Sequence, residues 1–170
     1  ILACLAVPVA AVTSPLFAAI KNFGLLDKHL GVMIPLVAFN APMMLLMIKN
    51  YFDTIPDELL ESARIDGASS FRIWLEFMVP LSGPIIANVL VLTFIYSWND
   101  YLVPLLVMRS EKNYTVTLAA QYFVSSTYQS PADVARIYAV MMLLTLPSII
   151  VYLFSQKFLV GGITSGSVKG

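Results

Sequence analysis

Two groups of polar residues interrupt a mainly apolar chain and are its candidates for binding chemistry. The first lies in the stretch ESARIDGASSFRIWLEFMVPLSGP, residues 61–84, where Glu61 can form an ionic or hydrogen-bonded contact with a partner. The second is the run 98–100, Trp98, Asn99 and Asp100. There an indole can stack on an apolar surface while the two polar side chains accept hydrogen bonds. An interfacial aromatic belt followed by a helix stop is the simpler explanation of the second group.

Other kinds of chemistry are absent from the sequence. There is no glycine-rich loop followed by Lys and Ser or Thr, the arrangement that cradles nucleotide phosphates. The single histidine, His29, lies beside Lys28 at a loop edge and receives no role, and a single cysteine excludes an intrachain disulfide. The methionines are simpler to explain as packing material than as a metal path. We therefore expect no metal, no cofactor and no enzyme activity in this chain.

The composition indicates which environment must position these residues. Hydrophobic residues make up 59% of the 170 residues and charged residues only 12%. An ordinary soluble domain has about 45–50% apolar and about 25% charged residues. The ten Lys and Arg are balanced by ten Asp and Glu, so no charge excess favours nucleic acid as a partner. The expected partner of most of the surface is a lipid bilayer.

Four long apolar windows predict the skeleton of the molecule. A membrane-spanning helix needs about 20 mainly apolar residues. Windows of this length without any charged residue occur at 1–20, 30–48, 77–99 and 137–156, and the third span is expected to extend to about 107. Prolines within these windows are tolerated in bundled membrane helices, so the helices are expected to be kinked. The sequence predicts an all-α, polytopic transmembrane bundle of about four spans in a single domain, 1–170, whose first residue already lies within an apolar run, as in a fragment or trimmed product.

The connections follow from the four spans. Residues 49–81 and the tail 157–170 lie on one side of the membrane, and residues 21–29 and 109–136 lie on the other. Within the latter loop, 113–132 lacks charge but is rich in Asn, Thr, Ser and Gln, which predicts a short interfacial helix followed by a loop. Each side carries five Lys and Arg, so the positive-inside rule does not determine the orientation.

The segment between the second and third windows predicts two short helices outside the membrane. Pro56 suits a first helical turn and Gly67 a helix end, which predicts a helix over about 56–66. Ser69 or Ser70 can cap a second helix, which runs through about 78 and closes at Pro80. A plain connector needs only about 2–8 residues, so a surface made for docking explains this segment better than a solvated linker.

The same segment resembles the EAA loop of bacterial ABC-importer permeases. That motif reads Glu-Ala-Ala, three residues, Gly, nine residues and Ile-x-Leu-Pro. The matching residues here are Glu61, Ser62, Ala63, Gly67, Phe77, Val79 and Pro80. Of these, Ser62, Phe77 and Val79 depart from the motif but keep the size or the apolar character of the motif residue. The stretches IPDELLESARIDGAS, YSWNDYLVPL and FLVGGITSGSVKG are similar to permeases of the carbohydrate type, in particular to the second permease of the maltose importer.

The resemblance covers nearly the whole chain and implies an architecture. The chain corresponds to about the last four of the six core spans of a type I importer permease, with the first two missing. It implies a bacterial or archaeal cell (inner) membrane, with the 49–81 loop and the 157–170 tail in the cytoplasm. The 109–136 loop then faces an extracytoplasmic substrate-binding protein. The other implied partners are a second permease subunit and a cytoplasmic ATPase dimer, which binds the ATP.

The resemblance also assigns roles to residues. The expected contacts with the ATPase subunit are Glu61, Ser62, Ala63, Arg64, Asp66, Gly67 and Pro80. For Arg64 and Asp66, solvated charges flanking a helix end are an equal alternative. Trp98, Asn99 and Asp100 are expected to line a sugar path. The glycine-rich tail is expected to reach the ATPase interface, although composition alone describes a frayed terminus.

Two functions from other classes compete with the importer. An ion-coupled secondary transporter would place carboxylates or histidines at mid-membrane depth, whereas the four windows contain no charged residue. A membrane scaffold would bind a cytoplasmic partner without any dependence of transport on that binding. The carried solute is not identified by the sequence, but the spans hold no arginine cluster for an acidic ligand, which favours a neutral sugar.

Overall fold

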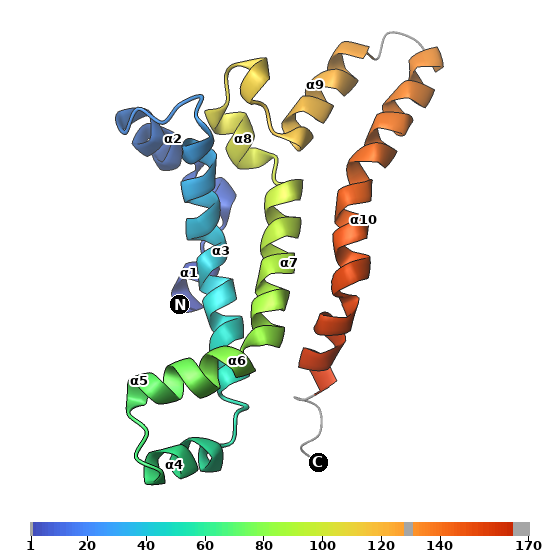
Figure 1. The fold of residues 1–170 in the computed structure, drawn as a ribbon. Helices are drawn as coiled ribbons and strands as arrows, with labels where there is room; N and C mark the ends of the chain where they lie inside the picture. The colour runs from blue at the N-terminus through green and yellow to red at the C-terminus, as the bar shows by residue number, and fades with distance from the viewer. Residues whose placement is uncertain (1, 128–130, 165–170) are drawn as a thin grey trace.

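The computed structural model describes residues 2–127 and 131–164, and every regular element in these ranges is helical. Three long helices run side by side along the molecule: α3 (His29–Phe52), α7 (Gly83–Asn99) and α10 (Val134–Thr164) (Figure 1). Helix α7 lies between the other two and contacts both. The predicted all-α class is confirmed.

Two helices in the described ranges are long and apolar enough to cross a membrane. These are α3 and the Val134–Gln156 part of α10, which contain the windows 30–48 and 137–156. A third crossing is formed if Ser70–Leu81 and Gly83–Asn99, which are bent by 62° relative to each other, are counted as one broken span. By length and composition, the described residues therefore hold two or three spans, fewer than the four expected.

The window 1–20 is divided rather than continuous. It contains α1 (Leu2–Leu5), a 3-10 turn η1 (Val9–Val12) and the start of α2 (Thr13–Asn22). Pro8 lies between the first two in extended backbone, with φ −70° and ψ 133°. Because proline has no backbone N–H and fixes φ, it ends one helical segment more readily than it continues it. This is where the structure departs from the expected first span.

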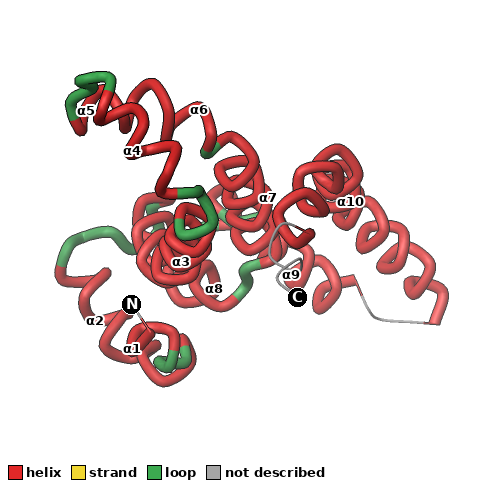
Figure 2. The backbone as a smooth tube through the Cα atoms, turned by 90° about the horizontal axis from the view of Figure 1, so that it is seen from below, coloured by secondary structure: helices red, strands yellow, loops and turns green. Residues whose placement is uncertain are grey.

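The window 77–107 also differs from a single helix. Asp100, in extended backbone, separates α7 from α8 (Leu102–Val107). At the other end, residues 77–81 belong to a continuous helical segment that contains α5 (Ser70–Ile73), the π-helical turn η2 (Trp74–Met78) and α6 (Val79–Leu81). We call this segment, Ser70–Leu81, the lateral helix, because it projects sideways from the base of α7 (Figures 1 and 2).

The lateral helix continues past the point where Pro80 was expected to close it. The N–H of Val79 bonds the carbonyl of Trp74, five residues back, as in a π-turn. Proline cannot donate a hydrogen bond, and its ring would crowd the carbonyl four residues before it in a regular α-helix. A π-turn just before Pro80 relieves that crowding, so the chain bends only after Leu81.

The two predicted extramembrane helices are present. Helix α4 (Asp57–Ile65) follows Pro56, close to the predicted 56–66. Ser69 accepts a hydrogen bond from the Arg72 N–H at 3.3 Å and so caps the lateral helix. At the opposite end of the molecule, α9 (Val116–Thr127) is the predicted short helix, flanked by the 3-10 turns η3 (Glu111–Asn113) and η4 (Pro131–Asp133). Helix α10 includes the first part of the predicted tail, and residues 165–170 lie outside the described ranges.

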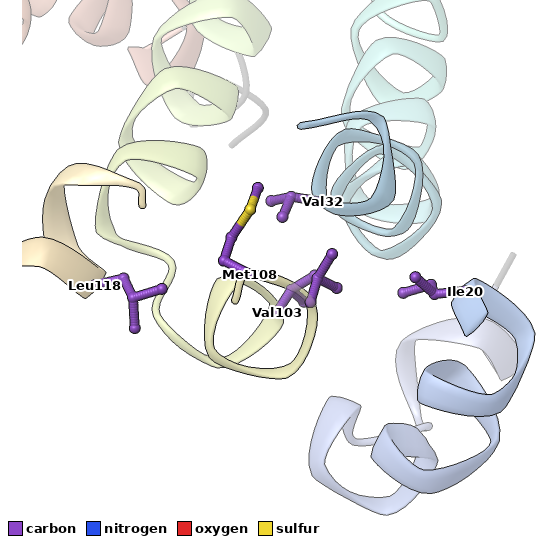
Figure 3. Packing of buried hydrophobic residues seen from close by; sticks show 6 residues of the cluster. Ile20, Val32, Val103, Met108 and Leu118 are labelled. Carbon is purple, nitrogen blue, oxygen red and sulfur yellow. The ribbon is translucent and has the colours of Figure 1, made fainter. Parts of the chain in front are cut away.

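The hydrophobic core lies at the end of the molecule remote from α4 (Figure 1). Its buried side chains come from α2, α3, α8 and α9 and the residue after α8, and they are Ile20, Val32, Val103, Val107, Met108 and Leu118 (Figure 3). Gly31 allows the close approach of α3 to this cluster, since a Cβ there would lie 2.3 Å from the Leu25 carbonyl oxygen. This core fixes the loops around it, whereas the long helices leave many large apolar side chains exposed within this chain.

Candidate coupling surface and translocation cleft

The turn after α4 is closed by backbone hydrogen bonds that depend on glycine. The Gly67 N–H donates to the Arg64 carbonyl at 3.0 Å, and the Ala68 N–H donates to the Ala63 carbonyl at 3.0 Å. This pattern is the Schellman motif, which requires a left-handed residue just after the helix. Gly67 has φ +82°, so the predicted chain reversal at this residue is present. Apart from Gly67 and its two chain neighbours, no atom of the described residues lies within 4 Å of a Cβ placed on Gly67, so its outer side is open.

The structure brings most of the predicted coupling residues onto one short helix and its end. Glu61, Ser62, Arg64 and Asp66 are exposed, whereas Ala63 is buried. The Ser62 hydroxyl donates to the Leu59 carbonyl at 2.9 Å and is thus engaged within α4. Within the described residues, Glu61 has no ion pair, which leaves its carboxylate available to another chain.

Pro80 lies apart from that group. It belongs to α6, at the other end of the lateral helix from the α4 turn (Figure 1). Pro80 lies near the 62° bend, where it affects the path of the backbone, and it is not part of the exposed surface of α4. The structure therefore separates the predicted coupling residues into a surface group and a bend.

Two features of this region were missed by the sequence analysis. Ile65, the last residue of α4, is 86% exposed, and the sequence signal was an isolated apolar residue at the end of a polar helix. The Tyr51 hydroxyl donates to the Leu81 carbonyl at 2.7 Å, which joins α3 to the base of the lateral helix. No local pattern indicates this contact, because the two residues are 30 positions apart.

At the other end of α7, the three predicted path residues are already engaged within the chain. The Trp98 indole N–H donates to the Leu144 carbonyl on α10 at 3.1 Å, and its ring stacks on Phe94 with centroids 5.5 Å apart. The Asn99 amide donates to the Ile95 carbonyl at 2.8 Å. Trp98 is therefore a contact between two long helices as well as a cleft residue.

Asp100 starts the next helix instead of facing the cleft. Its carboxylate accepts a hydrogen bond from the Val103 N–H at 3.2 Å in the first turn of α8. Burial raises the pKa of the Asp100 carboxyl, and the donation from Val103 opposes that shift. Its own carbonyl accepts the Thr117 hydroxyl at 2.6 Å, so Asp100 also fixes α9. The arrangement indicates a structural role for this residue.

A cleft of about 300 Å³ lies between α7, α9 and α10. Its lining contains aromatic, polar and apolar side chains, namely Trp98, Asn99, Tyr101, Val116, Thr117, Ala120, Gln121, Met141, Leu144 and Thr145. Gln121 is exposed and lies on α9, the helix that sequence analysis interpreted only as interfacial. The cleft can offer hydrogen-bonding groups beside aromatic surface, which suits a hydroxylated solute.

Asp27 is a further residue that sequence analysis missed. It has left-handed backbone, with φ 58°, and its carboxylate accepts hydrogen bonds from the Ser110 hydroxyl, the Ser110 N–H at 2.9 Å and the Arg109 N–H at 3.0 Å. The Asn113 amide donates to the Asp27 carbonyl at 2.8 Å. These donations, that of the Ser110 hydroxyl first, hold the pKa of Asp27 well below its ordinary value. Asp27 thus joins the loop before α3 to the loop after α8.

The described residues contain no group of three or more His, Cys, Asp or Glu side chains that could hold a metal ion. The polar groups found in the structure are instead arranged for hydrogen bonding between helices, within loops and at exposed surfaces.

Comparison with known proteins identifies the family of this chain. Residues 1–164 match the protein family described as "Binding-protein-dependent transport system inner membrane component". The inner membrane ABC transporter permease protein YcjP of Escherichia coli (strain K12) is 34% identical over 157 residues, which are 92% of this chain and 55% of that protein.

Two further relatives carry more specific names. The sn-glycerol-3-phosphate transport system permease protein UgpE of Yersinia pestis bv. Antiqua (strain Antiqua) is 36% identical over 94% of this chain and 56% of its own length. The arabinooligosaccharides transport system permease protein AraQ of Bacillus subtilis (strain 168) is 33% identical over 100% of this chain and 59% of its own length. The chain thus spans little more than half the length of these relatives. It belongs to the family of binding-protein-dependent transport system inner membrane components, which are transport permeases.

Proposed function

We propose that this chain forms part of the membrane-spanning permease subunit of an ATP-driven ABC importer. In this proposal the subunit forms the translocation path for a sugar delivered by a substrate-binding protein and couples to separate ATPase subunits through residues 61–80. The observation that carries the proposal is α4. It is a short helix that projects beyond the bundle, ends in a glycine-dependent turn and keeps Glu61 exposed without an ion pair in the described chain (Figure 1).

The mechanism follows from how α4 is attached. On one side it follows α3, and on the other it is linked through the lateral helix to α7. The Tyr51–Leu81 hydrogen bond joins these two attachments at the base of the bundle. A displacement of α4 by a closing ATPase dimer is therefore passed to α3 and α7 together, as a rigid-body movement. By linkage, a loaded binding protein on the outer loops must favour the same state that ATP favours.

The exposed residues assigned to ATPase contact in the proposal are Glu61, Ser62, Arg64, Asp66 and Gly67, with Pro80 shaping the backbone behind them. Ala63 is buried beneath the others and supports the exposed group. ATP is bound by the partner, and this chain contributes no catalytic residue and no cofactor site. The other partners in the proposal are a second permease subunit and the lipid bilayer.

For the solute, we propose a neutral sugar that passes the cleft between α7, α9 and α10. The relatives' names include an oligosaccharide and a glycerol phosphate, both rich in oxygen. Trp98, Asn99 and Gln121 line the cleft, and Gln121 offers it an exposed amide. Asp100 does not line the cleft, because its carboxylate caps α8. The absence of an arginine cluster in the spans favours the neutral compound.

The test uses the full-length subunit reconstituted with its ATPase, its second permease and its binding protein. Gly67→Asp places a side chain on a left-handed residue in the coupling turn and is expected to abolish the stimulation of ATP hydrolysis by loaded binding protein. Gly24→Asp is the matched control, because Gly24 also has positive φ, +64°, and open space around it, but lies in the loop at the other end of α3.

The importer proposal requires that Gly24→Asp keep coupled transport and Gly67→Asp lose it. If both variants lost coupled transport equally, backbone strain would explain the loss, and Gly67 would have no specific role in coupling. Uptake that continues without ATPase subunits and follows an ion gradient would favour a secondary transporter, and binding of the ATPase without any transport would favour a scaffold.

A further inference from the structure

The lateral helix presents an exposed apolar face whose role the proposed function does not explain. Phe71, Trp74 and Leu75 are spaced i, i+3 and i+4, so they share one side of the helix. Their side chains are 69%, 52% and 50% exposed. Large apolar side chains gathered on one face, rather than scattered singly, indicate an interaction surface.

The opposite face of the lateral helix is already occupied. Ile73 is only 6% exposed, and its position lies roughly opposite the apolar face at about 100° per residue. Helix α4 contacts α5, and Ala63, the buried residue of α4, is 4% exposed. One side of the lateral helix therefore packs against α4, and its exposed apolar face points away from α4.

The continuity with α7 determines what lies on that side. The lateral helix enters α7, an apolar helix within a span, through the 62° bend after Leu81. Figure 1 shows α4 on the side of the lateral helix remote from α3 and α7, and Figure 2 shows the lateral helix extending sideways from α7. Helix α7 runs beside α3 and α10, the two helices long and apolar enough to cross a membrane, so a helix bent by 62° from α7 lies closer to the plane of the membrane surface than to the direction of the crossing helices. The face turned away from α4 is then turned toward the lipid.

The chemistry of the face suits the interface between lipid and water. The rings of Phe71 and Trp74 lie 5.9 Å apart at 32° and form one continuous aromatic surface. Tryptophan is enriched at the headgroup level, where its ring is in a weakly polar layer and its N–H can reach water. On the flank, Arg72 and Glu76 form an ion pair at 2.9 Å with side chains 64% and 49% exposed. An apolar face beside a charged flank is typical of a helix that lies in the interface.

We propose that the lateral helix lies in the phospholipid headgroup layer, with Phe71, Trp74 and Leu75 in contact with lipid. It thereby holds α4 at a fixed depth below the membrane surface and orients it for its partner. This location does not depend on the identity of that partner. A soluble protein that approaches α4 meets the other side of the lateral helix, which is why lipid, rather than a soluble protein, is the occupant of the apolar face.

The test measures the depth of single nitroxide labels in the full-length protein, cleared of other cysteines, in vesicles of phosphatidylcholine and phosphatidylglycerol. Phe71→Cys and Leu75→Cys report the apolar face, and Glu76→Cys reports the charged flank. Ile65→Cys on α4 is the matched control, because Ile65 is also apolar and more exposed, 86%, but lies one helix farther from α7. The ratio of collisions with oxygen to collisions with a water-soluble nickel chelate is measured at each site.

The expected result is a several-fold higher ratio at residues 71 and 75 than at residues 65 and 76, unchanged when ATPase subunits are added. Ratios at 71 and 75 equal to that at 65 would show an aqueous face and overturn the proposal. Labels at 71 and 75 that are protected only after ATPase subunits are added would assign the face to protein instead. These outcomes are separate from the Gly67→Asp comparison, which measures coupled hydrolysis rather than depth.

Discussion

The hydroxyl of Tyr51, near the end of α3, donates a hydrogen bond to the carbonyl of Leu81, the last residue of the lateral helix, at 2.7 Å. The bond spans 30 residues of sequence and closes the loop that contains α4. The chain bends by 62° just after this carbonyl, so the bond holds α3 at the hinge between the lateral helix and α7.

Tyr51→Phe is expected to loosen this closure while keeping the ring. One neutral hydrogen bond contributes about 0.5–1.5 kcal/mol, and the partial exposure of the pair places the loss in the free energy of unfolding at the lower end. The main effect is expected on coupling, measured as transported solute per ATP hydrolysed in the reconstituted importer. Tyr138→Phe, an exposed tyrosine on α10, is the control and should leave that ratio unchanged. If Tyr51→Phe left the amount of solute transported per ATP unchanged, the Tyr51–Leu81 hydrogen bond would have no part in coupling.

Gly31→Ala is expected to destabilise the end of the molecule that holds the hydrophobic core. The added Cβ would lie 2.3 Å from the backbone oxygen of Leu25 and 2.9 Å from Cγ1 of Val107, so the backbone itself must move. Overpacking of this kind costs about 1–3 kcal/mol. Gly83→Ala is the control, since no atom lies within 4 Å of a Cβ at Gly83. Thermal unfolding in detergent should show a lower transition only for Gly31→Ala, and equal transitions would contradict the close contact.

Asp27→Asn is expected to lower stability in a pH-dependent way. The folded-state pKa of Asp27 is depressed, so its ionised form stabilises the folded state above the ordinary pKa of 3.8. That contribution is lost as the pH falls below 3.8 toward the depressed folded-state value. The unfolding temperature of Asp27→Asn should therefore be below that of the native protein at pH 7, and the difference should narrow near pH 3.

The control for Asp27 is Asp53→Asn, which removes an exposed carboxylate that pairs with Lys49. Exposed pairs contribute about 0–1 kcal/mol, so this variant should behave like the native protein at both pH values. A pH-independent difference for Asp27→Asn would show that packing of the loops, and not the charge of the carboxylate, stabilises this end of the molecule.

Substitutions of Trp98 and Gln121 are expected to change different quantities, stability and solute uptake respectively, although both residues line the cleft. Trp98→Phe keeps an aromatic ring but removes the indole N–H that bonds the Leu144 carbonyl, which should lower the free energy of unfolding by about 0.5–1.5 kcal/mol. Gln121→Ala removes an exposed amide and should leave stability unchanged while raising the KM for solute uptake. Gln156→Ala, exposed on α10 away from the cleft, is the control and should change neither quantity. An unchanged KM in Gln121→Ala would remove the cleft from the path.

Local sequence signals predicted several elements correctly. Pro56 and Gly67 predicted α4 within one residue at each end, and Ser69 caps the lateral helix as expected. Each of these signals acts between residues a few positions apart, through a fixed φ, a left-handed residue or one capping hydrogen bond. Composition likewise predicted the helical class and the apolar helices α3 and α10.

Long windows of apolar residues were less decisive. Hydropathy cannot distinguish one continuous helix from several short ones, so the divisions at Pro8 and at Asp100 appear only in the structure. The same holds for the π-turn before Pro80, which depends on how the backbone relieves a steric conflict.

The sequence by itself determined the apolar composition, the helical class, the short helix α4 and its glycine turn. Only the tertiary structure decided that Tyr51 meets Leu81, that Trp98 meets Leu144 and that Asp27 binds residues 82 and 83 positions away. It also decided that the apolar face of the lateral helix is directed away from α4. The physical reason is that such contacts depend on helix packing and chain bends. These bring together groups whose partners no spacing along the chain identifies.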